Sequence, residues 1–422
     1  MACVLAGSPV RADEGGTPPT EPADEAGPPS GEPAEGPTPP ADPDSPAAPE
    51  DEDDELKPIE WGPKGLDIRS RDGNYHAHID WRAQIRFTET TFGGKGLAPN
   101  PETREGQFKV NRARFKMGGH AYRPWLVYYL EFDFVTPALL DLRFTLKPSN
   151  AFQVRLGQWK FPYNRERVDS SGKQQFAERS IVTPYFTVDR QQGLALFGRL
   201  WEGRLADSWY NVAVNSATGR GGTGSVERPM VLGRWQWNFL KRDLSFSQSD
   251  YGYRKKTAAS VAVAGATWRG PYTSFSSQGG GGLDGFPIGD EDTYDVEQAM
   301  VETALQGHGF SFQQEYHWKR IEDTVNQTVT KLEGGYLQLG YFFHALVDWF
   351  PRPLELAARV ARVDPDVVKG DDLIREATFA ANWFFAGHRN KLTLDLSLLD
   401  REAADPDKRQ ETRVRLQWEV SF

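Results

Sequence analysis

The stretch His76-Ala77-His78-Ile79-Asp80-Trp81-Arg82-Ala83-Gln84-Ile85-Arg86-Phe87-Thr88 alternates polar and apolar side chains without an exception. Successive side chains of a β-strand point to opposite faces of the sheet, so this alternation predicts a strand with one apolar and one polar face. A helix would scatter the same residues around its circumference. We therefore expect a strand at residues 75–90.

The same period of two recurs along the chain to its last residue. Clear examples are the segments around Leu130, Leu142, Phe312, Leu394 and Leu416, in which the alternate positions are mostly polar or charged. Including weaker segments, we expect sixteen strands, at residues 75–90, 108–119, 125–135, 138–147, 151–159, 193–201, 208–215, 230–239, 258–269, 294–305, 308–318, 334–344, 354–364, 375–385, 389–399 and 412–422.

The connections between these strands alternate in length. We expect short ones at residues 119–124, 148–150, 202–207, 306–307, 345–353 and 386–388, and long ones at residues 91–107, 160–192, 216–229, 270–293, 319–333, 365–374 and 400–411. Two segments break the alternation, because residues 135–138 are short for a loop and residues 240–257 are long for a turn. An even strand number with short turns at one end and long loops at the other is typical of bacterial outer-membrane barrels.

The polar face of the strands is dense in arginine and carboxylate, whereas the other face is almost wholly large and apolar. A soluble β-sandwich also alternates, but its apolar face packs inward and its strands are typically shorter. A barrel of sixteen strands is wide enough to hold water. We therefore expect an all-β, 16-stranded antiparallel transmembrane β-barrel with its apolar face against lipid, short periplasmic turns and longer extracellular loops.

The net charge of the 422-residue chain, −10, belongs to its beginning. Residues 1–58 hold two basic and fifteen acidic groups, so the remainder carries 47 basic against 44 acidic groups. The single cysteine, Cys3, excludes a disulfide framework and a thiolate-based zinc site. The longest uncharged apolar stretch, residues 334–347, is too short for a membrane-spanning helix.

The first 58 residues differ from the rest in composition. Residues 1–12 end in a small-residue pattern and are expected to be the remnant of a signal peptide, with a disordered N-terminus as the alternative. Residues 13–58 are rich in proline and acidic groups and predict a disordered, extended spacer in the periplasm. The spacer is either a solvated tail or an arm that contacts peptidoglycan or a periplasmic partner. The barrel then occupies residues 59–422.

Several motifs resemble those of the phosphate-selective porin O and P family. They are RARF at 112–115, GQWKFP at 157–162, FAERS at 176–180, DRQQGL at 189–194, GYLQLGY at 335–341 and ELAARV at 355–360. The terminal Phe422 is similar to an outer-membrane assembly signal. The chain departs from the family in its proline-rich beginning and in a glycine-rich loop at residues 279–282.

The resemblance, which covers about residues 75–422, implies a homotrimeric channel that sits in outer-membrane lipid and passes small anions, including phosphate. It also implies that the third loop, residues 160–192, folds inward and narrows the pore. By motif position, Arg112, Arg114 and Asp141 are candidates for the constriction.

Further basic residues are expected to line the pathway by their place on polar faces or in the inward loop: Arg82, Arg86, Arg143, Arg165, Arg167, Lys173, Arg179 and Arg190. Guanidinium is planar and always charged, so a row of arginines can pass an oxyanion along by shared hydrogen bonds. Glu178 and Asp189 are expected to pair with the loop cations. For any single arginine the alternative is a ladder with carboxylates that only fixes the wall or holds the loop.

Other chemistry has little support in the sequence. His76 and His78 could begin a metal site if Asp80 or a neighbouring strand supplied a third ligand, but histidines on a polar face are the simpler interpretation, and we expect no metal and no cofactor. Residues 93–96 lack the spacing of a phosphate-binding P-loop, and no nucleophile elbow or nucleic-acid patch is present.

The sequence therefore predicts a mildly anion-selective porin rather than an enzyme. Two alternatives remain open at this point. One is a barrel with a plugged lumen that anchors the envelope through its acidic arm, and the other is a soluble sugar-binding β-protein.

Overall fold

The computed structural model describes residues 58–62, 65–93, 103–244, 246–289, 292–404 and 406–422. The interpretations of residues 1–12 as a signal-peptide remnant and of residues 13–58 as a spacer lie almost wholly outside the described residues.

The described residues form β-strands and a few short helices. The strands are β1 Ile59–Gly62, β2 Gly65–Arg69, β3 His76–Phe92, β4 Glu105–Ala121, β5 Arg123–Asp133, β6 Ala138–Leu146, β7 Gln153–Lys160, β8 Arg190–Leu200, β9 Ser208–Asn215, β10 Arg228–Trp237, β11 Ala258–Gly270, β12 Ser274–Ser276, β13 Gly279–Gly281, β14 Tyr294–Gly307, β15 Phe310–Asp323, β16 Thr328–Tyr341, β17 Leu354–Asp364, β18 Ile374–Phe384, β19 Asn390–Arg401 and β20 Gln410–Ser421. The helices are α1 Arg165–Val168, α2 Thr183–Phe186, α3 Pro406–Arg409 and the 3₁₀ helix η2 Phe343–Ala345.

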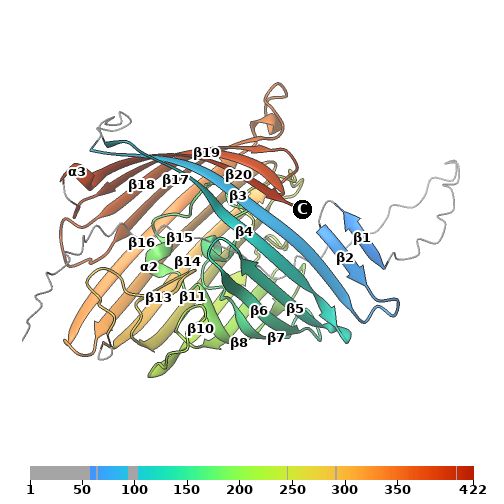
Figure 1. The fold of residues 1–422 in the computed structure, drawn as a ribbon, viewed down its shortest axis with the longest axis horizontal. Helices are drawn as coiled ribbons and strands as arrows, with labels where there is room; N and C mark the ends of the chain where they lie inside the picture. The colour runs from blue at the N-terminus through green and yellow to red at the C-terminus, as the bar shows by residue number, and fades with distance from the viewer. Residues whose placement is uncertain (1–57, 63–64, 94–102, 245, 290–291, 405) are drawn as a thin grey trace, which may run out of the picture.

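Sixteen of these strands, β3 to β11 and β14 to β20, form one closed antiparallel barrel (Figure 1). Each strand pairs with the next, and β20 closes the barrel by pairing with β3 from Glu411 opposite Phe92 to Ser421 opposite Arg82. The predicted 16-stranded antiparallel barrel is therefore confirmed.

The barrel has two different ends. At the turn end, residues 308–309 and 385–389 connect neighbouring strands, and at the loop end lie the longer connections 161–189 and 271–293. His308 and Gly309 both have positive φ (56° and 77°), which fits the tight two-residue turn of a hairpin. The assignment of these ends to periplasm and exterior stays a prediction.

The hairpin of β1 and β2 continues the wall beyond the end of β20. The backbone N–H groups and carbonyls of Phe422 and Trp81 bond reciprocally at 2.9 and 3.0 Å. Beyond that point β2 pairs with the same edge of β3, from Leu66 opposite Ile79 to Arg69 opposite His76. Phe422, the expected assembly signal, therefore directly follows the last barrel strand and is half exposed.

One expected loop is wrong. Residues 319–333 were expected to form a long connection, but β15 and β16 extend through most of them and are joined by residues 324–327. The alternation continues there, but the outward positions carry charges in place of apolar groups. Arg320 and Glu322 form an ion pair of 2.6 Å on the outside of β15. A prediction that requires an apolar outer face therefore does not recognise most of residues 319–333 as part of these strands.

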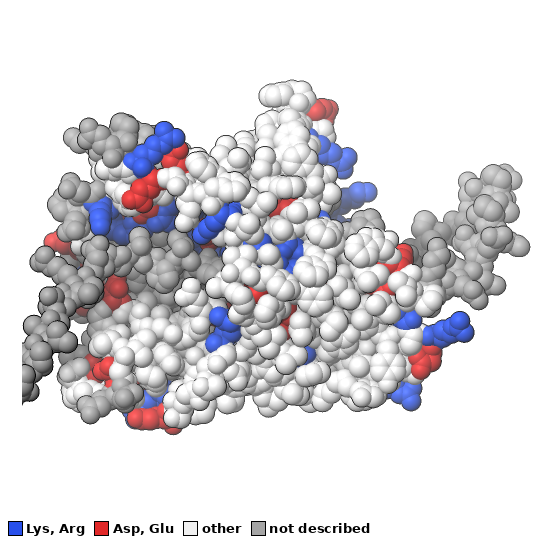
Figure 2. All heavy atoms as spheres, in the orientation of Figure 1, with Lys and Arg blue, Asp and Glu red and all other residues white. Residues whose placement is uncertain are grey.

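The strands separate their side chains as the alternation predicts. Trp81 and Phe87 of β3 are each 39% exposed on the outer surface, whereas Arg82 and Arg86 between them are 3% exposed. In Figure 2, much of the surface over the strands is uncharged and many charged side chains lie toward its margins. The apolar rows do not meet across a dry centre, as they would in a sandwich.

No helix among the described residues is long and apolar enough to cross a membrane.

Part of the interior near the loop end is apolar. Trp268, Tyr294 and Ile321 lie on the inward side of the wall, are fully buried and belong to one cluster with Phe186 of α2. The expectation of a polar face along the whole interior is wrong for this part. The connection 161–189 and residues 271–289 fold over the wall here and pack apolar side chains against it, which excludes water.

Candidate functional site

The connection between β7 and β8, residues 161–189, lies inside the barrel and is called the inward loop here. One carboxylate from each of five strands on the far wall, β14, β15, β17, β18 and β19, accepts a hydrogen bond from it: Glu302, Glu315, Glu355, Glu376 and Asp395. The loop therefore spans the lumen and is held by charge from the opposite side.

Helix α1 supplies the clearest of these anchors. The first N–H groups of a helix have no partner within it. Here Arg165 N donates to Glu302 Oε2 at 3.0 Å and Glu166 N donates to Glu315 Oε1 at 2.7 Å. The Arg165 side chain also pairs with Glu302 at 2.9 Å, so one carboxylate holds both the backbone and the guanidinium.

A glycine in the far wall makes room for the loop. A Cβ atom added at Gly340 of β16 would lie 1.8 Å from Nε2 of Gln175. That amide nitrogen donates to Glu355 Oε1 at 2.7 Å and to Ser311 Oγ at 2.8 Å. The absence of a side chain at position 340 therefore allows the loop to reach the wall.

Three predicted pathway residues lie together on β3 and β4 beside the inward loop. Arg82 pairs with Glu419 at 3.1 Å, and Arg86 pairs with Glu178 and donates to the backbone oxygen of Ala177 at 2.6 Å. Arg112 donates to Gln84 and is fully buried. Glu178 was expected to pair with a cation of the loop, but its partner is Arg86 of the wall.

A second group forms around three carboxylates on β5 and β6. Arg114 pairs with Glu131 at 2.6 Å and with Asp133 at 3.0 Å. Arg190 pairs with Asp141 at 2.6 Å and lies 3.7 Å from Glu131. Arg112 and Arg114 are therefore close in sequence but belong to different networks, and the charge of Arg114 is balanced by two acids.

The remaining cations of the loop differ in exposure. Arg167 pairs with Asp189, as expected for that acid. Arg179 is buried and donates to backbone oxygens, including that of Asp169 at 2.6 Å. Lys173 is exposed, unlike these arginines. Lys173 is therefore the loop cation that a dissolved anion can reach directly.

Several buried cations of the wall bind backbone oxygens in place of carboxylates. Lys160 donates to the carbonyl of Arg167 at 3.0 Å, and Lys319 donates to that of Tyr185 at 2.9 Å. Lys391 of β19 donates to the carbonyl of Gln174 at 2.5 Å. These three lysines therefore have neutral partners, as does the interior acid Glu355, which accepts from Gln175, Ser249 and Asn382.

A second segment enters the lumen from the turn end. Residues 238–257, between β10 and β11, are called the turn-end segment here. Gln248 Oε1 accepts a hydrogen bond from Gln175 N of the inward loop at 2.9 Å, and Ser249 Oγ donates to Glu355 Oε2 at 2.9 Å. The unusual length of this connection was visible in the sequence, but its place inside the barrel was not predicted.

His76 and His78 flank a carboxylate and leave no metal site among the described residues. His76 Nε2 lies 2.7 Å from Asp67 Oδ1 and His78 Nδ1 lies 3.2 Å from Asp67 Oδ2. Partial burial raises the pKa of the Asp67 carboxyl, but the hydrogen bonds from the two histidines outweigh burial and lower that pKa overall. These contacts fasten the β1–β2 hairpin to β3.

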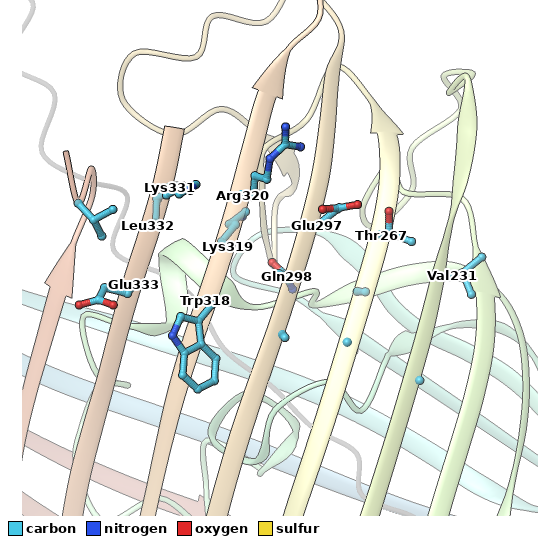
Figure 3. Close-up of a pocket in the computed structure, with 15 residues that line it drawn as sticks. Val231, Thr267, Glu297, Gln298, Trp318, Lys319, Arg320, Lys331, Leu332 and Glu333 are labelled. Carbon is cyan, nitrogen blue, oxygen red and sulfur yellow. The ribbon is translucent and has the colours of Figure 1, made fainter. Parts of the chain in front are cut away.

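A groove of about 710 Å³ lies on the outside of the barrel (Figure 3). The outward positions of β10, β11 and β14 are small here, with Gly233, Gly265 and Ala299 side by side in register, and Trp318 of β15 ends the row. Trp318 and Val231 are about half exposed, so the groove opens to the outside, and the interior cation Lys319 also contributes to its lining.

Comparisons with known proteins agree with the motifs and with the barrel. Residues 93–223 match the family model "Phosphate-selective porin O and P", which confirms the resemblance read from the sequence. A search of curated protein sequences found no match.

Two solved structures of similar fold are informative. An anion-selective porin from Comamonas acidovorans matches with a TM-score of 0.53 and 10% identity, over 82% of this chain and 100% of that chain. OmpT, an outer membrane protein of Vibrio cholerae, matches with a TM-score of 0.51 and 10% identity, over 82% of this chain and 98% of that chain. At these identities the likeness shows the fold.

Proposed function

We propose that the protein is an outer-membrane porin that forms a water-filled, mildly anion-selective channel for the passive diffusion of small anions. The family match and the porin fold support a channel. A barrel in which large apolar groups face outward and arginines face inward offers water and fixed positive charge in place of hydrocarbon.

The observation that carries the anion preference is that three interior lysines bind neutral oxygens and a fourth lysine is exposed. Lys160, Lys319 and Lys391 bind carbonyl oxygens, and Lys173 is exposed on the inward loop. Carboxylates that pair with arginines, such as Glu131 and Asp133 beside Arg114, would moderate the attraction so that an anion is not held too tightly. Conduction requires sites that bind an ion and also release it.

Phosphate is our best candidate for the solute, and a homotrimer for the assembly. Both come from the family resemblance, which is supported by the match over residues 93–223. The interior arginines suit oxyanions in general, since guanidinium binds them through two parallel hydrogen bonds. The choice of phosphate among oxyanions rests on the family resemblance.

The reversal potential of the reconstituted protein in a planar bilayer, measured across a KCl gradient, tests the proposal. We expect a reversal potential whose sign shows that chloride permeates better than potassium. A reversal potential of the opposite sign would refute the anion assignment. Single-channel conductance with and without added phosphate then tests the solute, since a bound oxyanion should reduce the chloride current.

A further inference from the structure

A group of basic side chains lies at the turn end, where the turn-end segment leaves the wall and returns to it. Its first residues include Lys241 and Arg242, soon after β10, and its last ones include Lys255 and Lys256, just before β11. All four are exposed, whereas the middle of the segment, around Gln248, is buried in the lumen. These cations therefore face the solution at the turn-end opening of the barrel.

Contacts between the two ends of the segment bring its cations close together. Arg242 Nη1 donates to the carbonyl oxygen of Thr257 at 2.7 Å, and Arg254 Nη1 donates to that of Asp243 at 3.2 Å. The basic residues of both ends therefore form one surface, which is called the basic patch here: Lys241, Arg242, Arg254, Lys255 and Lys256.

The acids nearest to the basic patch are occupied by other groups. Asp243 accepts a hydrogen bond from Trp209 Nε1 at 2.9 Å, and Asp250 is buried and accepts from Gly309 N at 2.8 Å. Within the part of the chain that the structure describes, Arg254 is the one patch residue within ion-pair distance of a carboxylate, at 3.8 Å from Asp250. The basic patch therefore keeps a net positive charge.

The same chain carries a segment of opposite charge that joins the barrel at this end. Residues 1–58 hold fifteen acidic and two basic groups, and residues 50–55 are an unbroken run of acids, Glu-Asp-Glu-Asp-Asp-Glu. This run ends shortly before Pro58, whose carbonyl oxygen accepts from Arg69 N at 2.8 Å at the tip of the β1–β2 hairpin. The hairpin lies at the turn end, past the C-terminus (Figure 1).

The length of the acidic segment suits it to reach the basic patch. A proline-rich chain such as residues 13–57 spans about 3 Å per residue when extended, which gives a reach on the order of 100 Å. A single exposed ion pair contributes little, but a run of acids opposite several cations forms many at once, and the tether keeps the partners at a high effective concentration.

We propose that the acidic segment, residues 13–57, docks on the basic patch of its own chain. The docked segment places negative charge beside the turn-end opening of the lumen and repels anions that enter there. It is a built-in inhibitor whose hold weakens with salt, because the Debye length falls from about 10 Å at 0.1 M to about 3 Å at 1 M. The inhibition rests on the proposed function, whereas the docking itself does not.

Energy transfer within the full chain in detergent tests the docking without requiring conduction. Dyes are attached at S45C in the acidic segment and at G252C in the turn-end segment, in a C3S background. We expect high transfer efficiency at low salt and a clear fall at high salt. Two variants should show the high-salt efficiency already at low salt: E50Q/D51N/E52Q/D53N/D54N/E55Q, which neutralises the acidic run, and K241Q/K255Q/K256Q, which neutralises most of the basic patch.

K331Q/K369Q/K408Q is the matched control, because it removes the same number of exposed lysines at the loop end. It should leave the transfer efficiency unchanged. Wild-type efficiency in the patch variant, an equal fall in the control, or an efficiency that does not depend on salt would each overturn the docking. Transfer that disappears when unlabelled protein is added in excess before assembly would place the segment on a neighbouring copy and overturn docking within one chain.

Reversal potentials in a KCl gradient separate this proposal from the proposed function. Neutralising residues 50–55 should raise the preference for chloride at low salt and leave it unchanged at high salt. An unchanged preference at low salt would overturn the inhibition. A channel without any anion preference, in which energy transfer still depends on the basic patch, would refute the proposed function and leave the docking intact.

Discussion

The inward loop and the turn-end segment both enter the lumen, but different forces hold them there. The inward loop is fastened by charge, since five strands each offer it a carboxylate. The turn-end segment has fewer charged anchors, chiefly the hydrogen bonds from Ser249 to Glu355 and from Gly309 N to Asp250. Its other contacts include rings, such as Tyr251 against Phe384 and Phe342. Among the described residues, it meets the loop through the amide hydrogen bond from Gln175 to Gln248 and through the Phe246 ring, whose centroid lies 5.0 Å from Arg165 Cζ.

The difference indicates which segment can move. A carboxylate that loses its partner inside the barrel leaves a buried charge, so the inward loop is expensive to displace. Rings and amides at the turn end can be solvated when they separate, at a much lower cost. We therefore expect the inward loop to fix the width of the channel. We expect the turn-end segment to obstruct the channel when it is docked and to leave the path open when it is displaced.

The largest effect is expected from loss of a loop anchor. Glu302 pairs with Arg165 at 2.9 Å and with Arg234 at 2.8 Å, so E302Q leaves two buried guanidiniums without a counter-charge. The free energy of unfolding, measured by urea titration in lipid vesicles, should fall by about 3 kcal/mol or more. E322Q removes a partly exposed partner of Arg320 and should cost less than about 1 kcal/mol. Equal losses would contradict the charge-fastened loop.

Removal of the turn-end segment should open the lumen without unfolding the barrel. When residues 240–256 are replaced by a short Gly-Ser linker, single-channel conductance should rise by about twofold or more because the obstruction beside Gln175 is lost. Shortening residues 344–350, a connection at the same end where Trp349 is exposed to the outside, is the control and should leave conductance unchanged. An unchanged conductance in the first variant would show that the segment does not obstruct the path.

The exposed loop cation should affect selectivity more than stability. K173Q removes an exposed positive charge of the inward loop, so the preference for chloride should fall by less than about twofold in permeability ratio. The reversal potential in a KCl gradient measures this change, with K331Q on the outer face of β16 as control. A shift as large in K331Q would mean that surface charge in general sets the selectivity.

The smallest effect concerns pH and the turn-end segment. Burial raises the pKa of the Asp250 carboxyl above its ordinary value, although the N–H groups of Gly309 and Arg254 partly offset this. The segment then binds a proton more readily when docked than when released, so its docking strengthens as the pH falls through the raised pKa. The conductance of the wild type should therefore decrease slightly on mild acidification. The D250N variant should not show the part of this decrease that comes from protonation of Asp250. An identical pH response in D250N would exclude Asp250 as its source.

The alternation of side chains was enough to predict sixteen strands, and the motifs were enough to place the inward loop. The prediction failed at residues 319–333, where Arg320 and Glu322 occupy outward positions and the outer face ceases to be apolar. The anchors were also missed. Glu302, Glu355 and Glu376 were visible as polar-face residues, but contacts with a loop more than a hundred residues away leave no local signal in one sequence.

The sequence by itself determined the strands, the side of the wall on which each residue lies and the excess of arginine on the inner side, because a strand assigns faces by a period of two. Only the tertiary structure decided which of those arginines meet an acid. Arg114 finds two carboxylates, whereas Arg143 and Arg155 find rings and a hydroxyl. The register of neighbouring strands and the path of two inserted segments set these partners, and both depend on closure of the whole barrel.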